Sequence, residues 1–303
     1  MTGGMDTLLA THFAHLFIRD PLVVYTKDLD SFDPTATNLF DSLQTTNWNT
    51  VRFKPPASQS PTERMGWRVE FRAMDVQVSD FENAAFAVTI ILLTRTILAY
   101  NLNLYIPIIK VDENMERANQ RNAVVNQSFH FRKSIFSAAT SGLVEDEYHL
   151  MTINEIMNGS PPSTNTSSPS IDGFSSPTDD FSSVNSSSSS SDNASSTNSS
   201  SSSINGLSPD GGAFPGLLPL VRRYLTTLSL TPAAYAKIDS YLSLVSKRAS
   251  GELWTAARWQ REFVRGHSEY KWDSVLSEGV AFDLLKRVRE IAEAGGEGLL
   301  GGW

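Results

Sequence analysis

The stretch Gly66–Asn83, GWRVEFRAMDVQVSDFEN, decides the fold, because its pattern is that of one strand leading directly into one capped helix. Side chains alternate between the two faces of a strand, so Arg68, Glu70 and Arg72 share one face. The other face is apolar and carries Trp67, Val69, Phe71 and Ala73. One face therefore presents a carboxylate between two guanidinium groups, a combination that suits a cation and a phosphate held together.

The second half of this stretch predicts a long central helix. Ser79 and Glu82 form an S-x-x-E capping box, which predicts that the helix begins there. We expect the helix to run to about Asn101 and, because it is apolar nearly all round, to lie at the centre of the fold. Before the helix, the apolar positions shift to Met74, Val76 and Val78. A bulge would explain the shift, but we favour a face that passes from an open site into the core.

An earlier segment, Thr45–Pro56 (TTNWNTVRFKPP), predicts a shorter strand that pairs with the first one. Arg52 and Lys54 share one face of this strand, and Trp48 stands at its start. The polar turn 57–66 completes a hairpin. Taken alone, these residues favour a core tryptophan and a solvated basic face.

The charged triplet of the main strand has two chemical interpretations. One is a structural salt-bridge ladder, in which an exposed pair contributes about 0–1 kcal/mol. The other is a site in which Glu70 holds Mg²⁺ and an arginine binds phosphate oxygens. The sequence contains no P-loop, no G-x-G-x-x-G and no kinase signature. The residues by themselves leave both interpretations open and favour the ladder.

The composition disfavours several classes of function. The chain has 303 residues, a formal net charge of −8 and no Cys. The acidic balance disfavours a nucleic-acid partner. The absence of Cys excludes disulfides and thiolate metal sites, and it fits a reducing, cytoplasmic compartment. We expect no membrane partner, because Arg95 interrupts the apolar run Ala84–Tyr100 and a span needs about 20 apolar residues; a buried helix is favoured.

Three consecutive regions are predicted along the chain. Residues 1–158 hold the sheet and the central helix, and residues 213–303 hold the C-terminal helices of the same domain. Residues 159–212 are dominated by Ser and have too few apolar side chains to offset the entropy of ordering, which predicts a disordered insertion. Helical spacing predicts further helices over residues up to 20, 110–132, 145–158, 215–228, 231–248, 253–264 and 280–294.

Two groups of polar residues are candidate metal ligands that have a simpler alternative. His12 and His15 share one face of the first predicted helix. Partly buried structural imidazoles are favoured there over a metal pair. Asp112, Glu113 and Glu116 lie on the amphipathic helix that follows the central one, where a solvated face is favoured over a metal site.

Six blocks of the sequence resemble, in the same order, the catalytic subunit of eukaryotic glutamate–cysteine ligases. The blocks are THFAHLFIRDPL, TTNWNTVRFKPP, GWRVEFRAMDVQVSDFENAAF, IPIIKVDENMERANQRNAV, FPGLLPLVRRYL and KRASGELWTAARWQREF. The resemblance covers nearly everything except the Ser-rich insertion, and its style indicates a fungal sequence. It implies an α+β fold similar to that of glutamine synthetase and its carboxylate–amine ligase relatives, in which an antiparallel sheet packs against a surrounding helical layer.

The resemblance also implies a reaction and a set of site residues. ATP phosphorylates the γ-carboxylate of glutamate, and the amine of cysteine attacks the acyl phosphate to give γ-glutamylcysteine, ADP and phosphate. In such enzymes the Glu of the EFR triplet binds Mg²⁺ and the Arg of the triplet contacts the ATP phosphates; these are Glu70 and Arg72 here. The Trp of the NW pair, here Trp48, lines the substrate end. No role is assigned to Arg68, Arg52, Lys54 or the KRASGE segment.

The chain departs from the family in two ways. The sequence Arg72-Ala73-Met74-Asp75 stands where the family pattern is R-P-M-E, so a rigid Pro is lost and a carboxylate is kept. We also expect an N-terminal part of the family's chain, with most of the magnesium-binding glutamates, to be missing before Met1. The chain is then expected to supply only part of an active site. The alternative is a non-catalytic protein that associates with a ligase chain or with its N-terminal half; a regulatory subunit is a further candidate partner.

Overall fold

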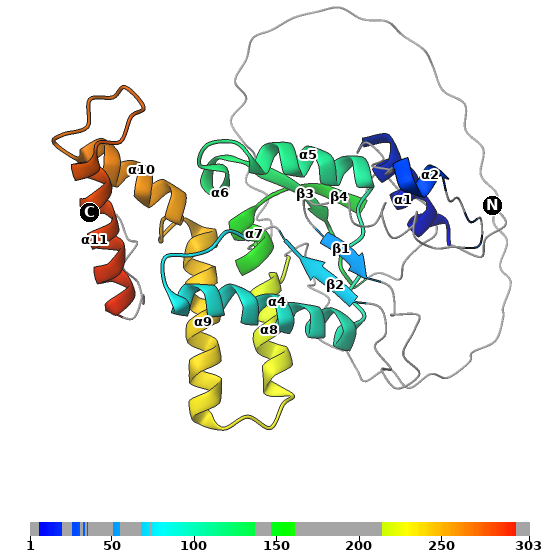
Figure 1. Ribbon diagram of the computed structural model, residues 1–303. Coiled ribbons are helices and arrows are strands. Elements are labelled where there is room, and N and C mark those ends of the chain that lie inside the picture. The colour runs from blue at the N-terminus through cyan, green and yellow to red at the C-terminus, as the bar shows by residue number, and fades with distance from the viewer. Residues whose placement is uncertain are drawn as a thin grey trace, which may run out of the picture.

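The computed structural model describes residues 6–19, 26–30, 33, 35, 51–54, 68–72, 74–136, 147–160 and 214–294 (Figure 1). Its elements are α1 (Thr7–Arg19), α2 (Thr26–Asp30), β1 (Val51–Lys54), β2 (Arg68–Phe71), α4 (Asp80–Tyr100), α5 (Ile108–Ala118), α6 (Ala123–Asn126), β3 (Ser128–Arg132), β4 (Tyr148–Thr152), α7 (Ile153–Asn158), α8 (Leu217–Thr226), α9 (Pro232–Ser250), α10 (Ala256–Gly266) and α11 (Glu278–Glu293). Helices and small antiparallel sheets confirm the α+β class. The likeness to the glutamine synthetase fold stays a prediction.

The predicted hairpin is present as a two-stranded antiparallel sheet of β1 and β2. Its register places Val51 opposite Phe71 and Lys54 opposite Arg68. The two strands contact each other far more than they contact any described helix. On β2, the side chains of Val69 and Phe71 are each 48 % exposed, so no described element covers the apolar face of this strand.

The segment between β2 and α4 differs from the prediction. We expected its apolar side chains to enter the core, but Met74 is 42 % exposed and Val76 is 88 % exposed. Val78 is the exception, because it packs against Trp259 and Ile291. The segment pairs with no described strand, so the period-two pattern has no second layer to bury it. The prediction was therefore wrong for the first two residues.

The main core lies where α4, α7, α8 and α9 meet (Figure 1). Ala85 of α4, Leu218 and Val221 of α8 and Leu242 of α9 are completely buried. Helix α9 begins as predicted, because the Thr231 side chain accepts a hydrogen bond from the Ala234 amide and a proline occupies the first turn. Burial of apolar surface from four helices holds this part of the chain together.

The described residues that flank the Ser-rich insertion, 158–160 and 214–216, lie side by side; residues 161–213 lie outside the described residues. The amide of Ser160 donates to the carbonyl of Phe214 at 3.0 Å, and Gly216 packs its Cα against Asn158 and Gly159. Gly216 has φ +80° and a Cβ there would lie 2.4 Å from the nitrogen of Gly159, so only glycine fits. The chain thus leaves and re-enters one helical layer between α7 and α8. The predicted division into three regions remains a prediction.

Helix α4 is buried on one side only. Its predicted capping box is confirmed, with reciprocal hydrogen bonds between Ser79 and Glu82. By length and composition it is the one described helix that could cross a membrane. Its inner face packs on α8 and α9, which fits the predicted buried helix, but the outer face exposes Ile91 (57 %) and Leu98 (77 %) beside Arg95. The prediction that this apolar helix lies at the centre of the fold therefore holds for its inner face but not for its outer face.

A buried ion pair joins α4 to α9. Arg248, at the end of α9, donates through Nη2 to the Glu82 carboxylate, and the two side chains are 7 % and 2 % exposed. Burial lowers the pKa of Arg248, and the negative charge of Glu82 opposes that change. The Nε and Nη1 atoms of Arg248 are buried without a hydrogen-bond partner among the described residues. This arginine belongs to the KRASGE segment, whose role the sequence left open.

A second antiparallel sheet, β3 with β4, was missed. Helix was predicted over residues 110–132 and 145–158, but 128–132 and 148–152 are strands with Phe129 opposite Met151. Helix α5 ends at Ala118, the left-handed Asn122 (φ 56°) precedes the short helix α6, and the chain becomes extended at Gln127. The side chain of Asn114 on α5 then bonds both the amide and the carbonyl of His130, which fixes β3 against that helix. Tertiary contacts therefore determine that residues 128–132 form a strand and not a helix.

Helices α10 and α11 form a smaller unit at the C-terminal end of the described chain (Figure 1). Trp259, Val280 and Ile291 are its buried residues. Helix α10 begins at Ala256, three residues later than predicted, because the side chain of Thr255 accepts from the amide of Arg258 and caps the helix.

Candidate functional site

The charged triplet lies at the exposed end of β2. The Arg72 Nε donates to Oε1 of Glu70 at 2.5 Å. The Arg72 side chain is 35 % exposed and that of Glu70 is 27 % exposed. Side chains two residues apart on a strand lie on the same face. This spacing brings the carboxylate and the guanidinium group together, as predicted.

The hairpin register adds basic positions next to this pair. Arg52 is the backbone partner of Glu70, and Lys54 is the backbone partner of Arg68. The Cα atoms of directly opposite residues in an antiparallel pair are about 4.5–5.5 Å apart. The register therefore sets two basic positions of β1 opposite two charged positions of β2.

Glu70 fits one ligand of a magnesium ion but not a complete site. No group of three or more His, Asp or Glu residues that could hold a metal occurs among the residues that the structure describes. Mg²⁺ in nucleotide sites is usually bound by one or two carboxylates together with phosphates and waters. Glu70 is partly exposed and beside an arginine, so it has the position for such a shared ligand. Trp48, the predicted substrate contact, lies outside the described residues.

Three of the other candidate ligands, His15, Asp112 and Glu113, have structural partners. His15 on α1 is 2.5 Å from the Asp112 carboxylate on α5, which joins the two helices. Glu113 accepts from Lys110 at 2.6 Å and lies 2.7 Å from Nε2 of His130. The hydrogen bond from Lys110 lowers the pKa of Glu113. These contacts agree with the favoured interpretation of structural imidazoles and a polar face.

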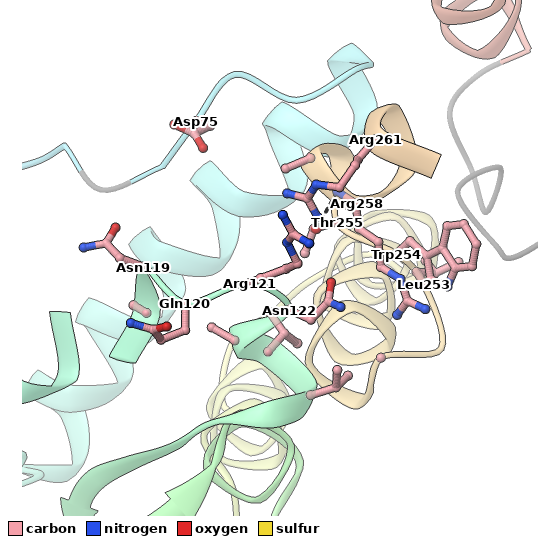
Figure 2. Close-up of a pocket in the computed structure, with 16 residues that line it drawn as sticks. Asp75, Asn119, Gln120, Arg121, Asn122, Leu253, Trp254, Thr255, Arg258 and Arg261 are labelled. Carbon is pink, nitrogen blue, oxygen red and sulfur yellow. Dashed lines mark hydrogen bonds between the residues drawn. The ribbon is translucent and has the colours of Figure 1, made fainter. Parts of the chain in front are cut away.

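A pocket that the sequence did not predict lies beyond the strand (Figure 2). Its volume is about 300 Å³, and its walls come from the α5–α6 turn, the end of α9 and the start of α10. Asp75 faces it from the segment between β2 and α4, and Arg121, Arg258 and Arg261 also line it. No sequence spacing connects residue 121 with residues 258 and 261, so only the fold brings them together.

The site as described is an exposed carboxylate–guanidinium pair at the end of a strand on an α+β chain. Comparison with known proteins gives the family. The family model for glutamate–cysteine ligase matches residues 1–173 and 174–291, and the chain belongs to the glutamate–cysteine ligase family. The predicted resemblance is confirmed.

Individual relatives show how much of the family's chain is present. The chain is 43 % identical to glutamate–cysteine ligase of Neurospora crassa over 99 % of its own length and 40 % of the relative. It is 38 % identical to glutamate–cysteine ligase of Dictyostelium discoideum, over 96 % of the chain and 38 % of the relative. It is 38 % identical to the human glutamate–cysteine ligase catalytic subunit, over 95 % and 39 % respectively. The chain thus spans about 40 % of the length of these curated relatives.

Proposed function

We propose that the chain forms one wall of an ATP-dependent ligase that joins the γ-carboxyl of L-glutamate to the amine of L-cysteine, the first step of glutathione biosynthesis. The observation that carries this proposal is the Glu70–Arg72 pair on an open strand of a chain that belongs to this family. An acyl phosphate intermediate needs positioning and charge neutralisation rather than a protein nucleophile. A chain without Cys can supply both.

The two residues have complementary roles in this proposal. Arg72 donates to the ATP phosphates, because a guanidinium group donates in pairs to phosphate oxygens. Glu70 orients Arg72 through the 2.5 Å contact and contributes one oxygen ligand to Mg²⁺. The metal, when bound, neutralises charge on the phosphates of the nucleotide. Trp48 lines the substrate end of the site, and the remaining carboxylate ligands come from outside the described residues.

A second candidate function is non-catalytic association with a ligase chain. The uncovered apolar face of β2, with Val69 and Phe71 each 48 % exposed, favours this candidate. Partners of the proposed complex are an N-terminal part of a ligase chain or a regulatory subunit. Large exposed apolar surfaces mark interaction sites in soluble proteins. The compartment we propose for either function is the cytoplasm.

The test is reconstitution of activity. The purified chain is mixed with the N-terminal 60 % or so of the Neurospora crassa ligase, in proportion to the roughly 40 % that this chain matches. ADP release that depends on both glutamate and cysteine is then measured. We expect little activity from the chain alone and turnover from the mixture. Full activity of the chain alone would refute the proposal that it supplies a single wall.

Substitution of the strand residues makes this test specific. Glu70→Gln in the mixture should lower kcat by about 100-fold or more, which corresponds to about 2.7 kcal/mol of lost transition-state stabilisation. Glu116→Gln is the matched control, because Glu116 is an exposed carboxylate on α5. If the two variants keep equal activity, Glu70 is not at the reaction centre. If the mixture forms a complex but stays inactive, association without catalysis is the correct function.

A further inference from the structure

Three arginines surround one concave pocket at the junction of α9, α6 and α10. Figure 2 shows Arg121 reaching from the turn before α6, and Arg258 and Arg261 from α10. Arg121 is exposed, whereas Arg258 and Arg261 are half-buried. The Arg258 guanidinium carbon lies 4.4 Å from the centre of the Trp254 ring, a cation–π contact that fixes its place in the wall.

None of these three side chains forms an ion pair with a described residue. The ion pairs of the neighbouring arginines Arg248 and Arg265 are made with Glu82 and Glu262, and none reaches the pocket arginines. Asp75 is the one carboxylate that lines the pocket. The chain as a whole carries a net charge of −8. A concave surface with three guanidinium groups is therefore positively charged on a protein that is negatively charged overall.

The backbone around the pocket adds to its positive potential. Helix α10 starts in the pocket wall, where Thr255 and Ala257 line the cavity next to the first turn. The first amides of a helix point outward and carry a partial positive charge. At the end of α9, Gly251 has φ +79°, and a Cβ there would lie 2.6 Å from Cγ1 of Val125. This close approach brings the α6 wall against α9 and gives the pocket its shape.

We propose that this pocket binds a phosphate ester of a small hydroxylated molecule, at a site separate from the Glu70–Arg72 strand. Three planar guanidinium groups and a helix N-terminus match the several oxygens and double charge of a phosphate group better than they match a single carboxylate. Asp75 faces the pocket from another segment and accepts hydrogen bonds from hydroxyl groups of the ligand (Figure 2). The volume of about 300 Å³ suits a small molecule.

The position of Asp75 would let a ligand in the pocket influence the strand that carries Arg72. Asp75 lies three residues after Arg72 on the chain, so a ligand that holds Asp75 also restrains the segment that leaves β2. The site does not depend on the ligase proposal, because no residue of the pocket belongs to the Glu70–Arg72 pair. Binding and catalysis are therefore separable by experiment.

The test is titration calorimetry of the whole chain with ribose 5-phosphate, inorganic phosphate and citrate as probes. We expect saturable binding of ribose 5-phosphate, weaker binding of inorganic phosphate, and the weakest binding of the tricarboxylate citrate. Arg261→Gln removes the charge and leaves a shorter, polar side chain, and it should weaken ribose 5-phosphate binding by about tenfold or more. Arg289→Gln, in an 81 % exposed arginine side chain on α11, is the matched control and should change nothing.

Each other outcome overturns the proposal. Absence of saturable binding for all three probes means that the pocket is not a ligand site. Tighter binding of citrate contradicts the phosphate class, and equal losses in Arg261→Gln and Arg289→Gln indicate general charge screening. Arg72→Gln separates the two sites: if it abolishes ribose 5-phosphate binding while Arg261→Gln does not, the probe occupies the strand site, which supports the ligase proposal and refutes this one.

Discussion

The β1–β2 hairpin and the helical core formed by α4, α8 and α9 each contain a carboxylate–guanidinium pair, but in opposite environments. Glu70 and Arg72 on the hairpin are 27 % and 35 % exposed. Glu82 and Arg248 in the core are 2 % and 7 % exposed. An exposed pair can exchange its partner for a metal or a phosphate at little cost, whereas a buried pair cannot be separated without leaving a charge in a low dielectric. Exposure, not pairing, decides which charges are available for chemistry.

The same contrast holds for apolar residues. Leu218, Val221 and Leu242 in the core are completely buried, whereas Val69 and Phe71 on the hairpin remain half exposed. The core is therefore stabilised by its own helices. The hairpin has an apolar face that needs further surface, which agrees with a chain that spans about 40 % of its relatives.

The largest expected effect is loss of the buried pair. Arg248→Met leaves Glu82 buried without its counter-charge, which should lower the free energy of unfolding by about 3–5 kcal/mol. Urea unfolding followed by far-ultraviolet circular dichroism measures this change. The double variant Glu82→Gln/Arg248→Met removes both charges and keeps a side chain that can still cap α4, so it should recover part of the loss. A double variant less stable than Arg248→Met would contradict this account.

The next effect compares apolar truncation in the two regions. Leu242→Ala removes a completely buried side chain from α9, and the cavity should lower the free energy of unfolding by about 2–5 kcal/mol. Phe71→Ala removes a 48 % exposed ring from β2 and should cost less than about 1 kcal/mol. Both are measured by urea unfolding under identical conditions. Equal losses would show that the hairpin is as much a part of the core as α9.

The core was the more predictable of the two regions. The S-x-x-E pattern at Ser79 and the Thr-Pro pair at Thr231 each satisfy helix amides locally, so α4 and α9 begin where the sequence predicted. The missed strands are different, because Ser128–Arg132 and Tyr148–Thr152 pair with each other across 15 intervening residues and rest on Asn114 of α5. Such contacts carry no periodic signal in a single sequence.

The sites divide in the same way. Alternation along one strand was enough to place Glu70 beside Arg72. The arginine pocket could not be predicted from the sequence, because Arg121 and Arg261 are far apart in the chain and are brought together only by the packing of α6, α9 and α10. The buried role of Arg248 was missed for the same reason, since its partner Glu82 lies on a different helix. Local pattern predicts a site on one element, and packing decides a site between elements.

The smallest expected effect concerns the pH dependence of stability in the second sheet. On β4, partial burial and the positive charge of Lys133 lower the pKa of His149, and Glu155 opposes them. The folded state therefore holds the neutral imidazole more strongly than the unfolded state does. Its contribution is complete above the ordinary pKa of histidine and is lost as the pH falls through the lowered value in the folded state.

This effect is isolated by substitution of the histidine. His149→Gln should flatten the decline in unfolding free energy between about pH 7 and pH 5, the range in which histidines titrate. Urea unfolding at several pH values measures the slope for each protein. Lys133→Gln should keep most of the slope, because burial is the larger cause of the shift and the lysine the smaller one. If His149→Gln leaves the slope of unfolding free energy against pH unchanged, the pH dependence of stability comes from other groups and not from His149.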